Sequence, residues 1–428
     1  MQHDTQGTQG TQGTQGTQGT QGTQGTQGTQ HRIVVLGAGY AGAVAAGRLA
    51  KRLHRDDVAI TLVNAEPDFV ERVRMHQLAA GQDLRPRPFS EMFAGTGVGL
   101  ELGRVTGVDV DRKTVAVAGT DGRAVELEYD TLVYALGSGG NDNGVPGAAE
   151  HAHEIAGRPG ALRLRERLAR LDAGRAVVVG GGLTGLEAAT EIAEARPDLD
   201  VALAARGGLG DWLSPKGRAH LHKVFGRLGI SLHEHAAVTA VEADRVTTAD
   251  GRDIPAAVTV WATGFAVHPI AQATALEVTG SGRIVVDGTM RSVSHPDVYA
   301  IGDAAMAMGP GDKPLRMSCA SGTPAAWLAA DAIAARLTGG KVPTMPIRYF
   351  NQCISLGRKE GLIQYVTADD RAVNAALTGR LAAVYKELIC KGAAWGVAHP
   401  TLGLPTRRRR TVGRAAPAAA GSAVAASA

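Results

Sequence analysis

The sequence contains few cysteines, and no two of them have the spacing of a metal-binding or redox motif. Among 428 residues only Cys319, Cys353 and Cys390 carry a thiol. None of them forms a Cys-x-x-Cys pair, and an odd number leaves at least one thiol outside any disulfide. A disulfide scaffold and a zinc ribbon are therefore not expected, and the simplest interpretation is that all three are small buried hydrophobic residues.

Long apolar segments are also missing. No apolar run reaches the roughly 18 to 20 residues that a membrane-spanning helix needs. The N-terminus is polar and lacks the apolar stretch of a secretory signal peptide. Hydrophobic residues still make up 44% of the chain, which is enough for a sizeable core. These features predict a cytoplasmic protein of two or three domains, and they leave open a peripheral contact with the cytoplasmic face of a membrane.

The body of the chain has almost no net charge, although the whole chain carries +4. Residues 406–428 contain five arginines and no acid, so the remainder carries about −1. A basic excess confined to one end does not predict a nucleic-acid partner. We expect residues 406–428 to be a disordered, solvated tail, with contact to anionic lipid or RNA as the less favoured alternative.

The N-terminus is a low-complexity repeat. Residues 5–28 are eight copies of Thr-Gln-Gly, followed by Thr29 and Gln30. Glycine at every third position is typical of collagen, but there is no proline here to hold an extended helix. Because the repeat has no apolar side chain to bury, residues 1–30 are predicted to be disordered.

Two strand–glycine turn–helix–strand units follow, and they predict the fold class. The first unit runs through a β-branched strand at 33–36, a glycine turn, a helix to about residue 53 and a strand at 58–63. The second repeats this order at 176–179, to about 195, and at 201–204. Each is the βαβ unit of a parallel sheet. We expect an α/β protein with two Rossmann-like domains.

The first glycine turn has the spacing of a dinucleotide-binding loop, Gly37-Ala38-Gly39-Tyr40-Ala41-Gly42. In such a loop the first glycine permits a tight turn, the second lets a pyrophosphate approach the backbone, and the third allows helix and strand to pack closely. The position expected to hold an acidic ribose ligand is Asn64, with Glu66 two residues away. An amide can bond a ribose hydroxyl, but it carries no charge.

The second glycine turn is Gly180-Gly181-Gly182-Leu183-Thr184-Gly185, followed by Glu187. Its second strand ends at Ala205 and Arg206, so it offers no carboxylate to a ribose 2′-hydroxyl. An arginine in this place favours a 2′-phosphate and hence NADPH over NADH. The alternative is a solvated surface arginine.

Later segments supply further glycine turns and one helix start. Strands at 131–136, 259–263 and 298–301 lead into Gly137, Gly264 and the Gly302-Asp303 turn. Thr323 followed by Pro324 predicts the N-cap and first position of a helix that runs to about residue 337. Two short histidine clusters, at 151–153 and 233–235, are interpreted as surface residues, so no metal site is expected.

The order of these motifs resembles that of the pyridine nucleotide-disulfide reductase-like flavoproteins, and most closely the branch of type II NADH dehydrogenases and ferroptosis-suppressor-type oxidoreductases. The resemblance covers roughly residues 31–345. It implies an FAD-binding domain at 31–145 and 268–345, an inserted NAD(P)-binding domain at 146–267, and a C-terminal interface domain at 346–405 that covers the flavin or forms a homodimer.

The resemblance also implies roles for individual residues. The FAD pyrophosphate would lie on the first glycine turn, the adenine at the backbone of Val105, and the ribityl chain or pyrophosphate at Asp303. NAD(P)H would lie on the second turn, with Glu187 near the nicotinamide. The helix beginning at Thr323 would direct its positive end at the flavin. The segment 69–76 would run along the FAD and bring Arg72 or His76 into contact with it, and a plain helical surface is the alternative. The implied cofactor-binding set is Gly37, Ala38, Gly39, Gly42, Asn64, Val105, Gly137, Gly180, Gly182, Gly185, Glu187, Arg206, Gly264, Gly302, Asp303 and Thr323.

The expected function is that of an FAD-dependent NAD(P)H oxidoreductase, in which a hydride passes to the flavin and electrons go on to a small acceptor. The cofactors carry this chemistry, so no catalytic side chain is required. The chain lacks the close cysteine pair of the disulfide reductases, and residues 317–322 lack the paired glutamines of many quinone-reducing relatives. The missing glutamines argue against quinone as the acceptor, so quinone is kept only as one candidate. The alternatives are a slow redox-sensing flavoprotein and a sulfide:quinone-type reductase that uses Cys319 and Cys353.

Overall fold

The computed structural model describes residues 30–412, so the Thr-Gln-Gly repeat at 1–29 and residues 413–428 lie outside the described part. The first unit is built on a seven-stranded sheet whose first five strands are parallel and whose last two continue antiparallel. In spatial order the strands are β18 (Val298–Ala300), β6 (Thr131–Tyr134), β1 (His31–Leu36), β2 (Val58–Asn64), β3 (Val98–Asp109), β4 (Thr114–Gly119) and β5 (Ala124–Glu128).

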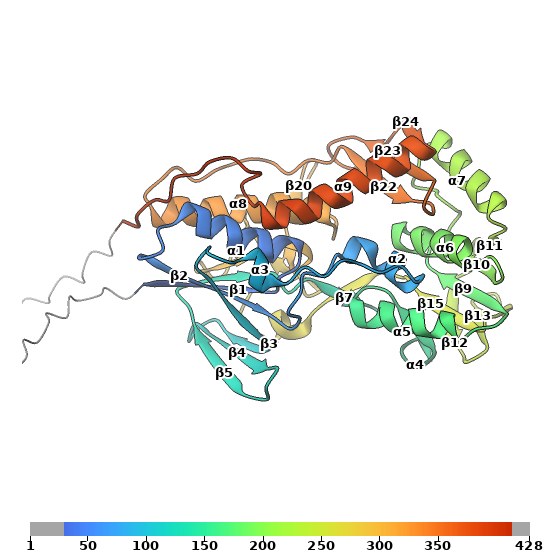
Figure 1. The fold of residues 1–428 in the computed structure, drawn as a ribbon, viewed down its shortest axis with the longest axis horizontal. Helices are drawn as coiled ribbons and strands as arrows, with labels where there is room; N and C mark the ends of the chain where they lie inside the picture. Colours follow the sequence, from blue (N-terminus) through green and yellow to red (C-terminus); the bar gives the residue numbers. More distant parts are fainter. Residues whose placement is uncertain (1–29, 413–428) are drawn as a thin grey trace, which may run out of the picture.

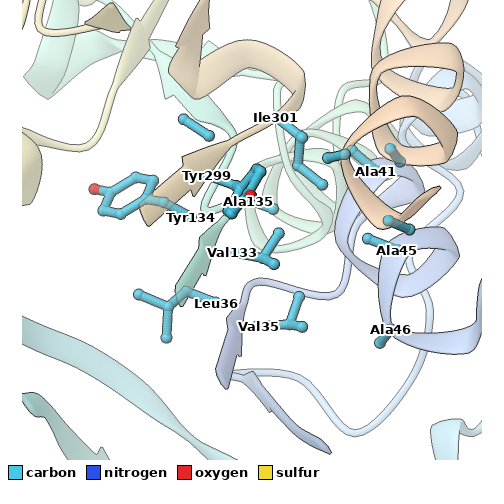
Figure 2. Close-up of a cluster of buried hydrophobic side chains, with 14 of the residues drawn as sticks. Val35, Leu36, Ala41, Ala45, Ala46, Val133, Tyr134, Ala135, Tyr299 and Ile301 are labelled. Atoms are coloured by element: carbon cyan, nitrogen blue, oxygen red, sulfur yellow. The ribbon is translucent and has the colours of Figure 1, made fainter. Parts of the chain in front are cut away.

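Two alanine-rich helices cover one face of this sheet and pack against each other, α1 (Tyr40–Arg52) and α8 (Cys319–Leu337) (Figure 1). Figure 2 shows why the contact is close. The small side chains of Ala41, Ala45 and Ala46 on α1 face Val133 of β6 and Ile301. All five residues are buried, so the helix backbone can lie near the sheet and bring its N-terminus close to the strand ends.

The second unit has a five-stranded parallel sheet with helices packed on it. Its strands in spatial order are β11 (Ser231–His233), β10 (Asp200–Ala204), β9 (Arg175–Val179), β15 (Val258–Trp261) and β8 (Ala152–Glu154). Its helices are α4 (Ala148–His151), α5 (Arg158–Ala169), α6 (Leu183–Ala195) and α7 (Pro215–Arg227). A three-stranded antiparallel sheet is attached, made of β12 (Val238–Val241), β13 (Arg245–Thr248) and β14 (Asp253–Pro255).

The units are linked by short elements of the connecting chain. Strands β7 (Ser138–Gly140) and β16 (Phe265–Val267) pair antiparallel where the chain enters and leaves the second unit. The remaining short pieces in the described residues are η1 (Arg72–Arg74), α2 (Met75–Ala79), α3 (Phe89–Met92), η2 (Pro269–Ala273), β17 (Ile284–Val285), η3 (Gly302–Ala304), β19 (Ala305–Met306), β20 (Met308–Gly309) and β21 (Lys313–Pro314). Within residues 30–412, no helix has the length and apolar character needed to cross a membrane.

A C-terminal region bridges the two units. It consists of β22 (Asn351–Ser355), β23 (Gly361–Val366) and β24 (Ala372–Thr378), followed by α9 (Arg380–Ala398), which contacts α1 while β22 and β24 contact α6 and α7 (Figure 1). One buried polar contact fixes the sheet to the second unit. The side-chain oxygen of Gln364 accepts hydrogen bonds from the backbone N–H and the hydroxyl of Ser214, the N-cap of α7.

The α/β fold class with parallel sheets is confirmed, but the predicted helix start at Thr323 is wrong. Helix α8 begins five residues earlier, with Ser318 as N-cap and Pro324 inside the helix. The carbonyl of Ser318 accepts from the backbone N–H groups of Ser321 and Gly322, which closes a turn before the proline. Proline lacks an N–H and so removes one backbone hydrogen bond from a helix. At Pro324 this loss falls in the second turn of α8, after the Ser318 carbonyl has closed the first turn.

The expectation that the basic tail is solvated from residue 406 is also wrong for its first part. Residues 406–412 lie along the end of α1. The backbone of Arg409 exchanges hydrogen bonds with Arg52 and His54, the N–H of Val412 donates to the carbonyl of Leu337 in α8, and Arg410 forms an ion pair with Asp57. Backbone pairing at a helix end that would otherwise have free carbonyl groups explains this order.

Candidate functional site

The first glycine turn has one face packed and the other open. Gly37 has φ +88°, and a Cβ there would lie 2.5 Å from the carbonyl oxygen of Ala135. A Cβ on Gly42 would lie 1.8 Å from the carbonyl oxygen of Gly37. A Cβ on Gly39 would meet nothing within 4 Å. The turn therefore tolerates no side chain at its first and third glycines, while the second faces space beside the N-terminus of α1.

The second glycine turn repeats this geometry. Gly180 has φ +127°, and its Cβ would lie 2.5 Å from the carbonyl oxygen of Ala262, while a Cβ on Gly185 would lie 1.9 Å from that of Gly180. Gly182, the N-cap of α6, again has nothing within 4 Å of a Cβ. The chain thus holds two turns with equal contacts, each at a helix N-terminus, which is the arrangement that accepts a pyrophosphate.

The side-chain amide of Asn64 is hydrogen-bonded to the protein backbone. Its side-chain oxygen accepts from the backbone N–H of Ala38 at 2.9 Å, and its NH₂ group donates to the carbonyl of Glu66 at 2.8 Å. The amide therefore holds the first glycine turn against the end of β2, which gives this residue a structural reason to be present. A ribose contact by Asn64 stays a prediction. The same holds for Val105, whose side chain is buried in β3.

Asp303 is surrounded by polar groups near the first glycine turn. Its carboxylate accepts a hydrogen bond of 2.6 Å from the hydroxyl of Ser138 and lies 3.9 Å from the guanidinium of Arg72. Gly302 has φ +66°, and a Cβ there would lie 3.2 Å from that of Ala41 in α1. Glycine at 302 thus lets the Asp303 turn approach the helix N-terminus, and Arg72 is brought to the same place.

Two of the predicted residues are glycines at strand ends beside the turns. Gly137 follows β6 with φ +72°, and Gly264 follows β15 with φ +77°. These strands are the direct neighbours of β1 and β9. The positive φ values turn the chain sharply away from each sheet next to its glycine loop. Thr323 lies inside α8 and is not its N-cap, because the helix begins at Cys319.

Glu187 lies in a buried cluster of charged groups where α6, α9, β22 and α2 meet. The carboxylate accepts hydrogen bonds from the ammonium of Lys386 at 2.9 Å and from the backbone N–H of Ser355 at 3.0 Å. The Nδ1 atom of His76 is 3.7 Å from its other oxygen. Lys386 also donates to the carbonyl of Cys353 at 3.1 Å. Three separate parts of the chain therefore converge on one carboxylate.

Burial and charge act in opposite directions on the pKa values of this cluster. Burial favours neutral forms of Glu187 and Lys386, but their mutual attraction outweighs it, so the pKa of Glu187 is lowered and that of Lys386 is raised. Burial dominates at His76 and lowers its pKa to about 4. At neutral pH the cluster therefore contains a carboxylate, an ammonium and an uncharged imidazole, whose buried Nε2 has no hydrogen-bond partner in the described structure.

The sequence analysis did not identify Lys386, although the residue spacing of its helix indicates that this lysine is buried. In α9 the residues Ala382, Lys386 and Cys390 are four apart and share one helix face. Ala382 and Cys390 are both buried, so a lysine between them is placed to be buried too. A neighbouring ion pair was also missed. Arg74 binds Glu387 through two hydrogen bonds of 2.9 and 3.0 Å, and it joins the first unit to the same helix.

The three cysteines are free thiols in the structure. Burial raises the pKa of Cys319 to about 12 and that of Cys353 to about 11. Both thiols are therefore protonated at neutral pH, and a protonated thiol is a weak nucleophile. Within residues 30–412 there is no group of three or more histidine, cysteine, aspartate or glutamate side chains that could hold a metal ion.

The comparison with protein families agrees with this geometry. Residues 31–332 match the pyridine nucleotide-disulphide oxidoreductase model, which covers both glycine turns. The chain belongs to the pyridine nucleotide-disulphide oxidoreductase family. It is therefore an oxidoreductase with the nucleotide-binding fold of that family, and the resemblance seen in its motifs is confirmed.

Several known proteins are similar to this chain over most of their length. A NADH dehydrogenase-like protein of Mycobacterium tuberculosis is 29% identical over 319 residues, which cover 68% of this chain and 77% of the relative. The type II NADH:quinone oxidoreductase NdhA of the same organism is 29% identical over 325 residues, covering 65% and 67%. The structure of NDH2 from Plasmodium falciparum in complex with NADH superposes with a TM-score of 0.72 at 14% identity, covering 89% and 99%.

Proposed function

We propose that this protein is an FAD-dependent NAD(P)H oxidoreductase that passes electrons to a small acceptor, with quinone as the leading candidate. The observation that carries this proposal is the pair of equal glycine turns. A chain that binds one dinucleotide needs one such turn, whereas a chain that moves electrons from a nicotinamide to a flavin needs two.

The first turn and its surroundings fit FAD. The open face of Gly39 leaves room for a pyrophosphate at the N-terminus of α1, where the helix dipole favours negative charge. Asp303 lies beside this turn and offers a carboxylate to hydroxyl groups of the ribityl chain. Ser138 donates a hydrogen bond to that carboxylate, and the guanidinium of Arg72 lies 3.9 Å from it. When bound, the flavin would supply the hydride acceptor of the reaction.

The second turn fits the nicotinamide nucleotide. Gly182 presents the same open face at the N-terminus of α6, and Glu187 lies four residues past the start of that helix. Its carboxylate is held by Lys386 and Ser355 of the C-terminal region. We propose that Glu187 positions Lys386, whose ammonium donates a hydrogen bond to the reduced acceptor. Its Nζ has three N–H groups, and the structure gives partners to two.

Quinone is favoured as the acceptor because relatives at 29% identity include a type II NADH:quinone oxidoreductase. Quinone reduction places negative charge on an oxygen atom, which the ammonium of the buried Lys386 would stabilise. The raised pKa values of Cys319 and Cys353 weigh against a sulfide reaction, since that chemistry starts from a thiolate or persulfide. A slow redox sensor would differ only in turnover.

A lipid-soluble acceptor implies contact with a membrane surface, and α9 offers a suitable face. Leu381, Val384, Leu388 and Trp395 follow one another at helical spacing and are between 46% and 71% exposed. We propose that this face rests on the cytoplasmic side of a membrane. A homodimer through the same face is the competing outcome, and size measurement in the absence of lipid separates the two.

The test is an acceptor series with the purified protein. First, the flavin absorbance and the released cofactor are measured. The protein is then given NAD(P)H with a soluble quinone, with ferricyanide, or with oxygen alone. Fast multiple turnover with quinone supports the proposal. A protein without bound FAD that cannot be reconstituted would refute it, and turnover that stays slow with every acceptor would favour the sensor.

A further inference from the structure

The internal symmetry of the two glycine turns identifies equivalent positions at the adenosine end of each site. The backbone N–H of Gly37 donates to the carbonyl of Val63 at 2.8 Å, and the N–H of Gly180 donates to that of Ala204 at 2.9 Å. The residues that follow, Asn64 and Ala205, therefore occupy the same place in their units. This is the end of the second strand, where a dinucleotide's adenosine ribose is recognised.

The side chains at these two positions point the same way. Asn64 reaches the backbone N–H of Ala38, the second residue of its turn. In the second unit, a Cβ on Gly181 would lie only 2.9 Å from the Cβ of Ala205. The methyl group of Ala205 therefore faces the glycine loop from the place where NADH-binding proteins put a carboxylate. A methyl group cannot accept a hydrogen bond from a ribose 2′-hydroxyl.

The next residue is a cation without a partner. Arg206 is exposed and forms no hydrogen bond or ion pair with any residue that the structure describes. Arg218, by contrast, is engaged in an ion pair with Asp211 at 3.3 Å. A guanidinium that is not paired with the protein can form the bidentate contact that suits a phosphate group.

The carboxylates beside the loop at 207–211 accept hydrogen bonds from the backbone of that loop. Asp211 accepts a hydrogen bond from the backbone N–H of Gly208 at 2.6 Å, and Glu234 accepts one from Leu209 at 2.6 Å. Both carboxylates therefore stabilise the 207–211 backbone. Neither takes the place of the missing acid at position 205.

We infer that Ala205 and Arg206 form a 2′-phosphate subsite, so that the protein uses NADPH in preference to NADH. This inference rests on the proposed function, because it concerns the specificity of the same nucleotide site. It sets the chain apart from relatives whose names specify NADH. Arg206 binds the 2′-phosphate, and the small Ala205 leaves room for it.

Anaerobic reduction of the FAD-loaded enzyme by NADPH and by NADH tests the inference. The second-order rate constant of flavin reduction in wild type should be at least tenfold higher with NADPH than with NADH. Arg206→Ala should lower the value for NADPH by about 10- to 100-fold, the contribution of hydrogen bonds to a charged group. The value for NADH should stay within about twofold. The double variant Ala205→Asp, Arg206→Ala should prefer NADH.

Two further measurements separate this inference from the proposed function. Arg123→Ala, at an exposed turn between β4 and β5, is the control for loss of one positive charge. Binding of 2′,5′-ADP and of 5′-AMP is measured by calorimetry, without turnover. Faster reduction by NADH than by NADPH overturns the inference and leaves the function standing. If neither NADPH nor NADH reduces the flavin, the proposed function is wrong. If 2′,5′-ADP and 5′-AMP then also bind equally, the 2′-phosphate subsite is wrong as well.

Discussion

Replacing Lys386 by methionine should destabilise the protein strongly, because it leaves the buried carboxylate of Glu187 without its counter-charge. The side chains of Lys386 and Glu187 are only 15% and 10% exposed. Removing one partner of such a pair typically costs about 3–5 kcal/mol. Methionine has a similar volume, so the loss should come from charge and not from packing. The carboxylate would keep the N–H of Ser355 and the neutral His76.

The pH dependence gives this prediction a distinctive sign. In wild type the pKa of Glu187 is lowered, so its contribution is present above the unfolded value of 4.5 and is lost as pH falls further. Without Lys386, burial dominates and the pKa of Glu187 rises. The folded variant then binds a proton more readily than the unfolded chain, and its stability increases as pH falls. The gap between Lys386→Met and wild type should therefore shrink from pH 7 to pH 5.

The assay is urea-induced unfolding of the purified proteins at both pH values, followed by circular dichroism. Lys391→Met is the matched control, because Lys391 lies on the same helix with a 68% exposed side chain and an ion pair to Glu387. It should cost at most about 0.5 kcal/mol. Adding Glu187→Gln to Lys386→Met should recover part of the loss. A Lys386→Met variant as stable as the control, or a gap that widens in acid, would refute the reasoning.

Burial lowers the pKa of His76 to about 4, whereas the unfolded chain binds this proton near pH 6.5. The free energy of unfolding of wild type should therefore fall by about 3 kcal/mol between pH 6.5 and pH 4. His76→Gln should remove this slope from the acid unfolding curves. Gly39→Ala should keep the wild-type unfolding midpoint, since its Cβ meets no protein atom, yet purify with little flavin, whereas Gly226→Ala on α7 should retain full flavin. Leu388→Glu should reduce sedimentation with anionic vesicles about tenfold or more without altering turnover with a soluble quinone; unchanged sedimentation would exclude the α9 face.

The glycine turns could be predicted from sequence because their requirements are local. A side chain at Gly42 or Gly185 would overlap a carbonyl oxygen within the same turn, so only glycine fits, and the spacing alone reveals it. The parallel sheets followed from β-branched runs in the same way. Asn64 was found at the predicted position, but its hydrogen bond to Ala38 could not be inferred, because an amide serves the turn and a ligand equally well.

The features that sequence did not reveal depend on distant contacts. Helix α8 begins at Cys319 because the Ser318 carbonyl closes a turn there, and a Thr-Pro pair looked like a stronger start. Residues 406–412 are ordered by pairing with the end of α1, about 350 residues earlier in the chain. Lys386 meets Glu187 only because the C-terminal region folds over both units. From composition alone, charged residues of this kind are predicted to be exposed to solvent.

The central claim is that a nicotinamide nucleotide on the second glycine turn reduces a flavin on the first. Anaerobic stopped-flow mixing of the yellow protein with NADPH and with NADH tests it most directly, with Gly182→Ala beside wild type. We predict rapid loss of the flavin absorbance in wild type. Gly182→Ala should slow this reaction by about 10-fold or more, as expected for overpacking at a ligand contact, while dithionite still reduces its flavin fully. If neither nucleotide bleaches a flavin that dithionite reduces, or if Gly182→Ala reacts as fast as wild type, the claim is wrong.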